Sequence, residues 1–132
     1  MKSIKISLFA TIALLLFSIN IHAQGIIFCE SADKYGRPIN AADTFDVSPQ
    51  GGILTVLLKP GHSLNTTVIF YQIYTVDGPN ESLNNIERQE VQPEWVYSWV
   101  HLNFAEQGKY RIKAISEDNT FIGSGDVYIK VE

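Results

Sequence analysis

Side chains suited to chemistry are sparse in this 132-residue chain, which has three histidines and one cysteine. His62 follows Pro60-Gly61 in a turn sequence and has no acidic or nucleophilic neighbour, whereas His101 precedes Leu102 on the expected polar face of a strand. Cys29 and His101 would form a nucleophile–base pair only if the fold brought them together, and nothing in their spacing requires it. The sequence therefore predicts no catalytic residues, and we expect a protein that is not an enzyme.

Metal ligands are also scarce. His22 lies in an apolar N-terminal stretch and the one methionine is Met1, whereas copper sites need several imidazole or thioether ligands. The carboxylates lack the one-three-five spacing of a calcium-binding loop. They are scattered over the chain as Asp33, Asp43, Asp46, Asp77, Asp118 and Asp126. We therefore interpret them as solvated surface charge, and we expect no metal ion and no cofactor.

Three aromatic residues recur at every second position of the segment 95–104: Trp95, Tyr97 and Trp99, followed by His101. Alternate residues of a strand share one face, which sets these rings roughly 7 Å apart in a row. The buried face would then be formed by Val96, Val100, Leu102 and Phe104. An exposed row of this kind stacks on sugar rings or anchors a protein partner. Alternatively, Trp95 or Trp99 is the core tryptophan of the domain, or the loop 82–93 covers the row.

The elements that position these residues all have the two-residue period of β-strands. We expect strands at residues 25–30, 44–47, 53–59, 66–76 and 95–104, a short one near 86–91, and two within 104–132. Segment 66–76 is apolar on both faces, which is typical of a central strand covered on both sides. Segment 31–43 has the composition of a surface loop, and 77–80 that of a tight turn. No stretch has helical periodicity, so the chain is expected to be all-β, a sandwich of two antiparallel sheets with seven to eight strands.

The C-terminal stretch 104–132 is the clearest of these elements and reads as a hairpin. Its first strand places Tyr110, Ile112 and Ala114 on one face, and its second strand does the same with Val127, Ile129 and Val131. Asp118-Asn119 supplies the turn, because both residues tolerate left-handed backbone angles. Gly123-Ser124-Gly125 precedes a strand rather than a helix. It therefore predicts a bulge or a close backbone contact and not a phosphate-binding loop.

The sequence Gly108-Lys109-Tyr110 resembles the tyrosine corner of immunoglobulin-like domains. In that motif a tyrosine at the start of the penultimate strand sends its hydroxyl back to upstream backbone, two residues before an inward core position, here Ile112. The resemblance implies an immunoglobulin-like β-sandwich over most of residues 25–132. The chain lacks both core cysteines of antibody domains and a clear core tryptophan in 66–76, so it is more similar to the diverse bacterial immunoglobulin-like modules.

A second resemblance concerns the layout of the C-terminal hairpin. Periplasmic copper-binding sandwiches of the CopC type end in a G-x-Y strand, a Ser-x-Asp-Gly-His turn and a last strand. Residues 116–120 stand at the corresponding turn as Ser-Glu-Asp-Asn-Thr, so the histidine is absent. The similarity therefore implies the layout without its copper ligands, and a metal-binding periplasmic protein is the least favoured function.

The N-terminal residues 1–23 have the pattern of an export signal. Lys2 and Lys5 precede an apolar run from 8 to 21, and Ala23 offers a cleavage point before Gln24. A membrane anchor is the alternative, but the continuous apolar core of the run is shorter than the roughly 20 residues that span a bilayer. We therefore expect cleavage near Ala23, no membrane insertion afterwards, and one domain over 24–132 that is secreted or periplasmic.

The charge balance limits the class of partner. The chain has a formal charge of −4, and after removal of residues 1–23 it keeps 8 basic against 14 acidic residues, hence −6. Nucleic acid is therefore an unfavourable partner, since its binding depends on Lys and Arg at phosphates. Cys29 cannot form an internal disulfide; it is either a buried hydrophobe or a thiol for intermolecular pairing. We expect an exported interaction module that binds a protein, or alternatively a glycan, in an oligomeric state that the sequence leaves open.

Overall fold

The computed structural model describes residues 25–132, so the predicted export signal lies outside the described residues. These residues form ten strands and no helix, which confirms the all-β prediction. The strands are β1 (Ile26–Cys29), β2 (Ser31–Ala32), β3 (Pro38–Ile39), β4 (Thr44–Val47), β5 (Gly52–Leu58), β6 (Val68–Asp77), β7 (Asn80–Glu90), β8 (Ser98–Phe104), β9 (Gly108–Ser116) and β10 (Phe121–Val131). No helix long and apolar enough to cross a membrane occurs in this part of the chain.

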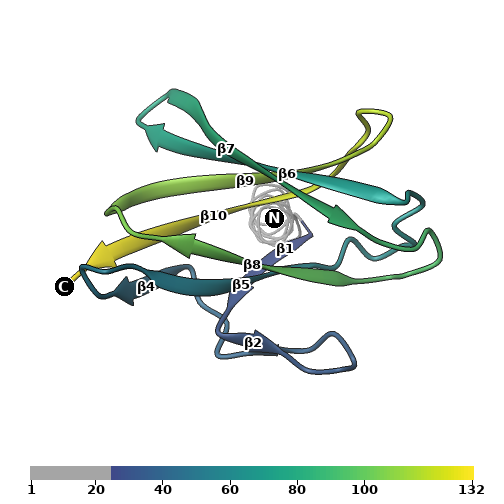
Figure 1. Ribbon diagram of the computed structural model, residues 1–132, viewed down its shortest axis with the longest axis horizontal. Helices are drawn as coiled ribbons and strands as arrows, with labels where there is room; N and C mark the ends of the chain where they lie inside the picture. The colour runs from purple at the N-terminus through teal and green to yellow at the C-terminus, as the bar shows by residue number, and fades with distance from the viewer. Residues whose placement is uncertain (1–24) are drawn as a thin grey trace, which may run out of the picture.

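The strands form two main sheets, which lie one above the other in Figure 1. The first has the order β1-β5-β8 and the second the order β4-β10-β9-β6-β7, while β2 and β3 form a small separate hairpin. One apolar cluster is built from inward-facing residues of both main sheets, including Leu54 and Val56 of β5 and Ile69 and Tyr71 of β6. This arrangement is that of a β-sandwich, in which alternate side chains of each strand enter a shared core.

The C-terminal hairpin lies at the centre of the five-stranded sheet, because β9 pairs with β10 on one side and with β6 on the other. Of its six predicted inward residues Val131 is partly buried against the core, and the other five are confirmed as buried: Tyr110, Ile112, Ala114, Val127 and Ile129. The turn is closed by the Ser116 N–H, which donates to the Thr120 carbonyl at 2.9 Å, and Asn119 takes a left-handed φ of 72°. Such a backbone angle is well tolerated by asparagine, as the sequence indicates.

The predicted irregularity at Gly123-Ser124-Gly125 is also confirmed. The pairing register of β10 with β9 shifts between Phe121 and Gly123, which is a β-bulge. A Cβ atom at Gly125 would stand 3.0 Å from side-chain atoms of Ile26 and Phe28, so β1 approaches the backbone of β10 closely here. A side chain at Gly125 would therefore push β1 away from the edge of the second sheet.

The tyrosine at the start of β9 bonds to upstream backbone, as the motif predicts. The Tyr110 hydroxyl donates to the Glu106 carbonyl at 2.8 Å, and its ring is 4% exposed. The ring meets the edge of Phe104 at a centroid distance of 4.9 Å, which ties the end of β8 to the start of β9. Gly108 has a φ of +152°, a backbone angle that side-chain-bearing residues rarely adopt.

Three expectations about the strands are wrong. Residues 82–90 belong to the eleven-residue strand β7, although we expected a loop with a short strand near 86–91. As an edge strand, β7 is mostly exposed and needs no apolar alternation. Strand β6 is buried on one face only; the other face, with Phe70, Gln72 and Tyr74, is half-buried. Segment 31–43 contains the β2–β3 hairpin instead of loop alone.

The sheets are also not purely antiparallel. Strand β4 runs parallel to β10, with Phe45 opposite Ile129 and Val47 opposite Val131. Segment 44–47 was correctly predicted as a strand, but alternation does not encode the direction of pairing. With β2 and β3 added, ten strands replace the seven to eight that we expected.

Candidate functional site

An open hollow of about 520 Å³ lies at the start of β8. It is lined by Gln89, Glu94, Trp95, Val96, Tyr97, Ser98 and Trp99. The three predicted aromatic residues therefore come together around one depression. His101, predicted to continue their row, does not line it.

The hollow exists because β8 begins later than the alternation suggested. Pro93 occupies the second position of a four-residue turn, in which the Trp95 N–H donates to the Gln92 carbonyl at 3.1 Å. The Trp95 carbonyl in turn accepts the Leu64 N–H at 2.7 Å. Trp95 thus sits on a fixed loop before the strand, with its side chain 44% exposed. The proline was the signal in the sequence for a turn just before the expected strand.

Val96 corrects the predicted buried face of this segment. We expected it to enter the core with Leu102 and Phe104, but it is 52% exposed and borders the hollow. Within β8 the predicted phase is right, because Leu102 and Phe104 are each 4% exposed and His101 faces solvent. The alternation of β8 begins only at Ser98, so the three residues before it follow the loop instead of the strand.

Tyr97 forms the floor of the hollow together with Trp99. The two rings are nearly parallel, at an angle of 8°, with centroids 6.1 Å apart. On its other side the Tyr97 ring lies against Gly36 in the β2–β3 loop, and its hydroxyl donates to the Lys34 carbonyl. The row is therefore partly covered by residues 34–36, and Gln89 of segment 82–93 also lines the hollow beside it.

The β2–β3 hairpin covers part of the outer face of the three-stranded sheet. Cross-strand pairing puts Cys29 and His101 on either side of Thr55, and Trp99 beside Leu57. Cys29, Thr55 and Leu57 are fully buried, although they lie on the face away from the sandwich core. The hairpin holds this second apolar layer in place, and the Lys59 ammonium donates to the Gly36 carbonyl at 3.3 Å.

The two larger polar side chains that line the hollow, Gln89 and Glu94, differ in whether the protein holds them in place. Gln89 is held at both ends, since its amide nitrogen donates to the Trp99 carbonyl at 2.7 Å and its oxygen accepts the Tyr71 hydroxyl at 2.9 Å. It therefore supports the floor of the hollow. Glu94 is exposed and, among the described residues that line the hollow, is the one with a charged side chain. The hollow is thus an apolar depression with a carboxylate at its rim.

The histidines and the cysteine make contacts that do not resemble a nucleophile–base pair. His101 Nδ1 lies 3.1 Å from the Thr55 hydroxyl, which is itself buried and donates to the Glu30 carbonyl at 3.0 Å. Because the hydroxyl has a single proton, it accepts a hydrogen bond from His101 and does not face solvent. The Cys29 thiol is directed to the Thr55 carbonyl at 3.7 Å, and burial raises the pKa of this thiol. His62 contacts its neighbouring Ser63 carbonyl at 2.8 Å.

Carboxylates in the described residues are mostly engaged with the protein itself. The Asp33 carboxylate accepts the backbone N–H of Tyr35 at 2.8 Å and that of Arg37 at 3.0 Å. Asp118 is bonded to the Ser116 hydroxyl and lies 3.3 Å from the Thr120 N–H. Residues 25–132 contain no group of three or more His, Cys, Asp or Glu side chains arranged to hold a metal ion.

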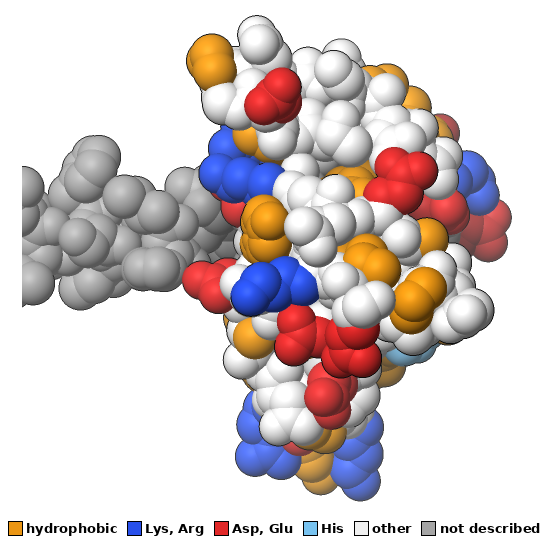
Figure 2. All heavy atoms as spheres, turned by 90° about the vertical axis from the view of Figure 1, so that its left-hand side faces the viewer, with side chains coloured by type: hydrophobic (Ala, Val, Ile, Leu, Met, Phe, Trp, Pro, Cys, Tyr) orange, Lys and Arg blue, Asp and Glu red, His pale blue; other side chains and the backbone are white. Residues whose placement is uncertain are grey.

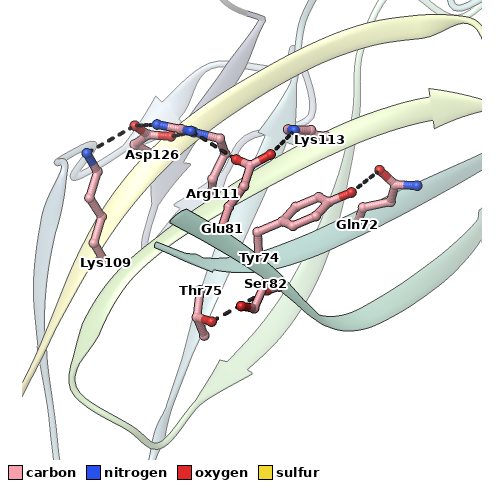
Figure 3. Close-up of polar contacts among 9 residues, drawn as sticks. All are labelled: Gln72, Tyr74, Thr75, Glu81, Ser82, Lys109, Arg111, Lys113 and Asp126. Carbon is pink, nitrogen blue, oxygen red and sulfur yellow. Dashed lines mark hydrogen bonds and ion pairs between the residues drawn. The ribbon is translucent and has the colours of Figure 1, made fainter. Parts of the chain in front are cut away.

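An ion-pair network lies on the outer face of the five-stranded sheet (Figure 3). Arg111 binds Asp126 at 2.8 Å and Glu81 at 3.0 Å, and Lys113 binds Glu81 at 2.6 Å. The Arg111 guanidinium holds the pKa of Asp126 below its usual range, and Lys113 followed by Arg111 does the same for Glu81. Acidic and basic side chains are interspersed in the same way over the end of the molecule in Figure 2.

The chain matches no protein-family model and no curated protein sequence.

Proposed function

We propose that this chain is an exported immunoglobulin-like β-sandwich that acts as a non-enzymatic interaction module and binds a protein partner at the cell envelope or outside the cell. The N-terminal signal pattern supports export. The hollow at the start of β8 supports binding, and the strand order supports the immunoglobulin-like assignment.

The strand order supports that assignment in detail. Immunoglobulin domains pair strands A, B and E in one sheet and strands G, F, C and C′ in the other. The order β1-β5-β8 corresponds to A-B-E, and β10-β9-β6-β7 corresponds to G-F-C-C′. In this correspondence Tyr110 lies near the start of strand F and bonds back across the E–F corner to Glu106, which is the place of the tyrosine corner.

One observation carries the binding proposal: Trp95 and Val96 are about half exposed beside an apolar hollow whose floor is rigid. Large exposed apolar side chains concentrate binding energy when they meet a partner, and tryptophan is enriched among such anchors. The floor is held by Gln89 and by the Tyr97 hydroxyl, so little conformational freedom is lost on binding. The site is therefore pre-formed.

The chemistry of the hollow favours one class of partner. Its apolar walls suit an apolar or aromatic side chain, and Glu94 at the rim suits a neighbouring lysine or arginine. The formal charge of −6 after signal removal also favours a basic partner surface, because opposite charges raise the rate of encounter. We therefore expect a protein segment that presents an apolar side chain next to a basic one.

A pull-down from the native cell envelope tests the proposal, with the partner then titrated against purified variants. Trp95→Ala should weaken binding about 30-fold or more, the effect of losing an anchor worth about 2 kcal/mol. Ile53→Ala is the matched control, since Ile53 is 71% exposed on β5 and does not line the hollow. Glu94→Gln should weaken binding less and reduce its salt dependence. Equal binding by wild type and Trp95→Ala would refute the site.

Glycan binding is a second candidate, favoured by the exposed indole of Trp95. Sugar rings stack on open aromatic faces, but one face of Tyr97 is covered by Gly36, so a flat platform of three rings is not formed. Titration of tryptophan fluorescence with a glycan panel separates the candidates, because a sugar stacked on Trp95 changes its emission. Trp95→Ala should abolish that change if glycan is the ligand.

A further inference from the structure

We propose that two copies of this chain pair through the edge of β7, antiparallel and around a twofold axis between Asn84 and Asn85, so that their five-stranded sheets form one continuous sheet. The side chains proposed to pair do not line the hollow, although Gln89 of the same strand does, and the proposal is independent of what the hollow binds.

Strand β7 has a long free edge. It is last in the order of its sheet, and in the described part of the chain no strand pairs with its second edge. Figure 1 shows β7 at the outer margin of the sandwich. Its eleven residues include neither lysine nor proline, two residues that commonly protect edge strands, and its charges are three glutamates and one arginine. The Ile86 N–H donates to its neighbour Asn85 Oδ1 at 2.8 Å, so a second strand would displace this side-chain bond to use the donor.

A bulge gives β7 the pattern that a twofold pairing needs. The register with β6 shifts so that Leu83 lies opposite Tyr74 and Ile86 lies opposite Gln72. The Tyr74 hydroxyl donates to Gln72 at 3.0 Å, which places both on the outer face. Leu83 and Ile86 therefore share that face despite their odd spacing, and they are 52% and 48% exposed.

Charged residues flank this apolar pair on the same face. Glu81 lies opposite Val76, and Arg88 lies opposite Phe70, again alternate positions of β6. Along its outer face β7 thus reads acid, apolar, apolar, base. This order is self-complementary when a second copy runs in the opposite direction. In such a twofold interface each contact occurs twice, so acid meets base and apolar meets apolar on both sides of the axis.

The register follows from these residues. With the axis between Asn84 and Asn85, each Leu83 faces Ile86 of the other copy and each Glu81 faces Arg88. A shift of one residue would bring Glu81 or Leu83 level with Glu87, which lies on the opposite face of β7 because it pairs with the buried Tyr71. Either shift therefore loses both outer-face pairs, the apolar one and the charged one.

The charged residues at the proposed contact, Glu81 and Arg88, do not oppose pairing. Glu81 already binds Arg111 and Lys113, as Figure 3 shows, so an added arginine alone would be repelled. Arg88, however, forms an ion pair with Glu90 at 3.4 Å, so the two side chains together bring no net charge to the contact. The apolar contact of Leu83 with Ile86 and the backbone ladder then supply the attraction. The contact is small, so we expect a weak, concentration-dependent dimer.

Sedimentation of the full chain, expressed with its own N-terminal segment and purified from its final location, tests this pairing. Between about 1 µM and about 500 µM, the range of small interfaces, its mass should rise from one chain toward two. Leu83→Lys and Ile86→Lys should abolish the rise, since both side chains are exposed and the fold does not depend on them. Ile53→Lys is the control and should dimerise normally. A single-chain mass throughout, or a dimer unaffected by both β7 variants, would overturn the proposal.

Disulfide cross-linking tests the register. Leu83→Cys chains mixed with Ile86→Cys chains should form a mixed disulfide, because these residues face each other. Chains carrying the same cysteine should cross-link far less, since identical positions lie about 10 Å apart along the strands. Cys29 is fully buried and does not interfere. Equal cross-linking in all three mixtures would contradict the twofold register.

Discussion

The Tyr97 ring lies directly on the backbone of Gly36, so that a Cβ atom at Gly36 would stand 2.6 Å from the ring carbons. This contact joins the β2–β3 hairpin to the start of β8, and with it the Tyr97 hydroxyl reaches the Lys34 carbonyl. One side of the hollow floor is therefore set by a glycine that is about 60 residues away in the sequence.

Gly36→Ala should loosen the β2–β3 hairpin. Gly36 has a φ of 74°, which costs a side-chain-bearing residue about 1–2 kcal/mol, and the new methyl group would also collide with the ring. We expect faster hydrogen exchange at the Glu30 and Ala42 amides, which bond to the Ile39 and Phe28 carbonyls.

Gly78→Ala separates the two causes of this loss. Gly78 has a φ of 60° and no atoms near the position of a Cβ, so it reports backbone strain alone. The difference between the two variants in urea unfolding is then the cost of the collision with Tyr97. Equal losses in both variants, with no local change in exchange, would show that the ring contact contributes nothing.

The fold was predictable where alternation is strong and local. Inward positions of β9 and β10 follow a strict two-residue period, and the turn and bulge between them have their own residue signals. Strand β7 was predicted only in part, near 86–91, because an exposed edge strand buries little and needs no apolar period. The parallel pairing of β4 with β10 is set by contacts distant in sequence, which alternation does not encode.

The candidate site was predictable only in part. The two-residue period predicted that Trp95, Tyr97 and Trp99 lie near one another, and all three line the hollow. It could not show that Gly36 covers one ring, or that a turn at Pro93 precedes a strand that begins only at Ser98. Glu94 had no signal as a rim residue, because its position depends on that turn. Long-range packing decides which aromatic faces stay open.

Tyr110→Phe should destabilise the sandwich by about 1 kcal/mol, the net value of a neutral hydrogen bond that is part-buried. The ring stays in the core, so packing against Phe104 is kept and only the bond to the Glu106 carbonyl is lost. Urea unfolding of both proteins measures the change. Tyr128→Phe is the control, since Tyr128 is exposed on β10 and its loss should be close to neutral. Equal effects at both positions would contradict the role of the corner.

The network around Arg111 should make stability depend on pH in acid. The pKa values of Asp126 and Glu81 are lowered in the folded state, so the unfolded chain binds more protons as pH falls. Their contribution is complete above about pH 5 and is lost as pH falls below about 4, through the folded pKa values. The free energy of unfolding, measured across this range with urea, should therefore rise with pH.

Arg111→Gln should reduce that rise. Removing the guanidinium returns the pKa of Asp126 toward its ordinary value, while Lys113 still holds Glu81 in part. The slope of unfolding free energy against pH is the readout, so a general loss of stability does not mimic the effect. Lys130→Gln, at an exposed position of β10, should leave the slope unchanged. An unaltered slope in Arg111→Gln would mean that the network has no energetic role.

Cys29 should be unreactive in the folded chain, although the protein is expected in an oxidising compartment. The side chain is fully buried beneath the β2–β3 hairpin, and burial raises the pKa of its thiol, which disfavours the reactive thiolate. A disulfide-forming reagent should label it at least about 100-fold more slowly than an exposed thiol, because about 3 kcal/mol of local opening must precede reaction. Ile53→Cys supplies that exposed thiol for comparison. In denaturant both thiols should react fully. Rapid labelling of native Cys29, or disulfide-linked dimers of the natural chain, would instead favour the intermolecular pairing that the sequence left open.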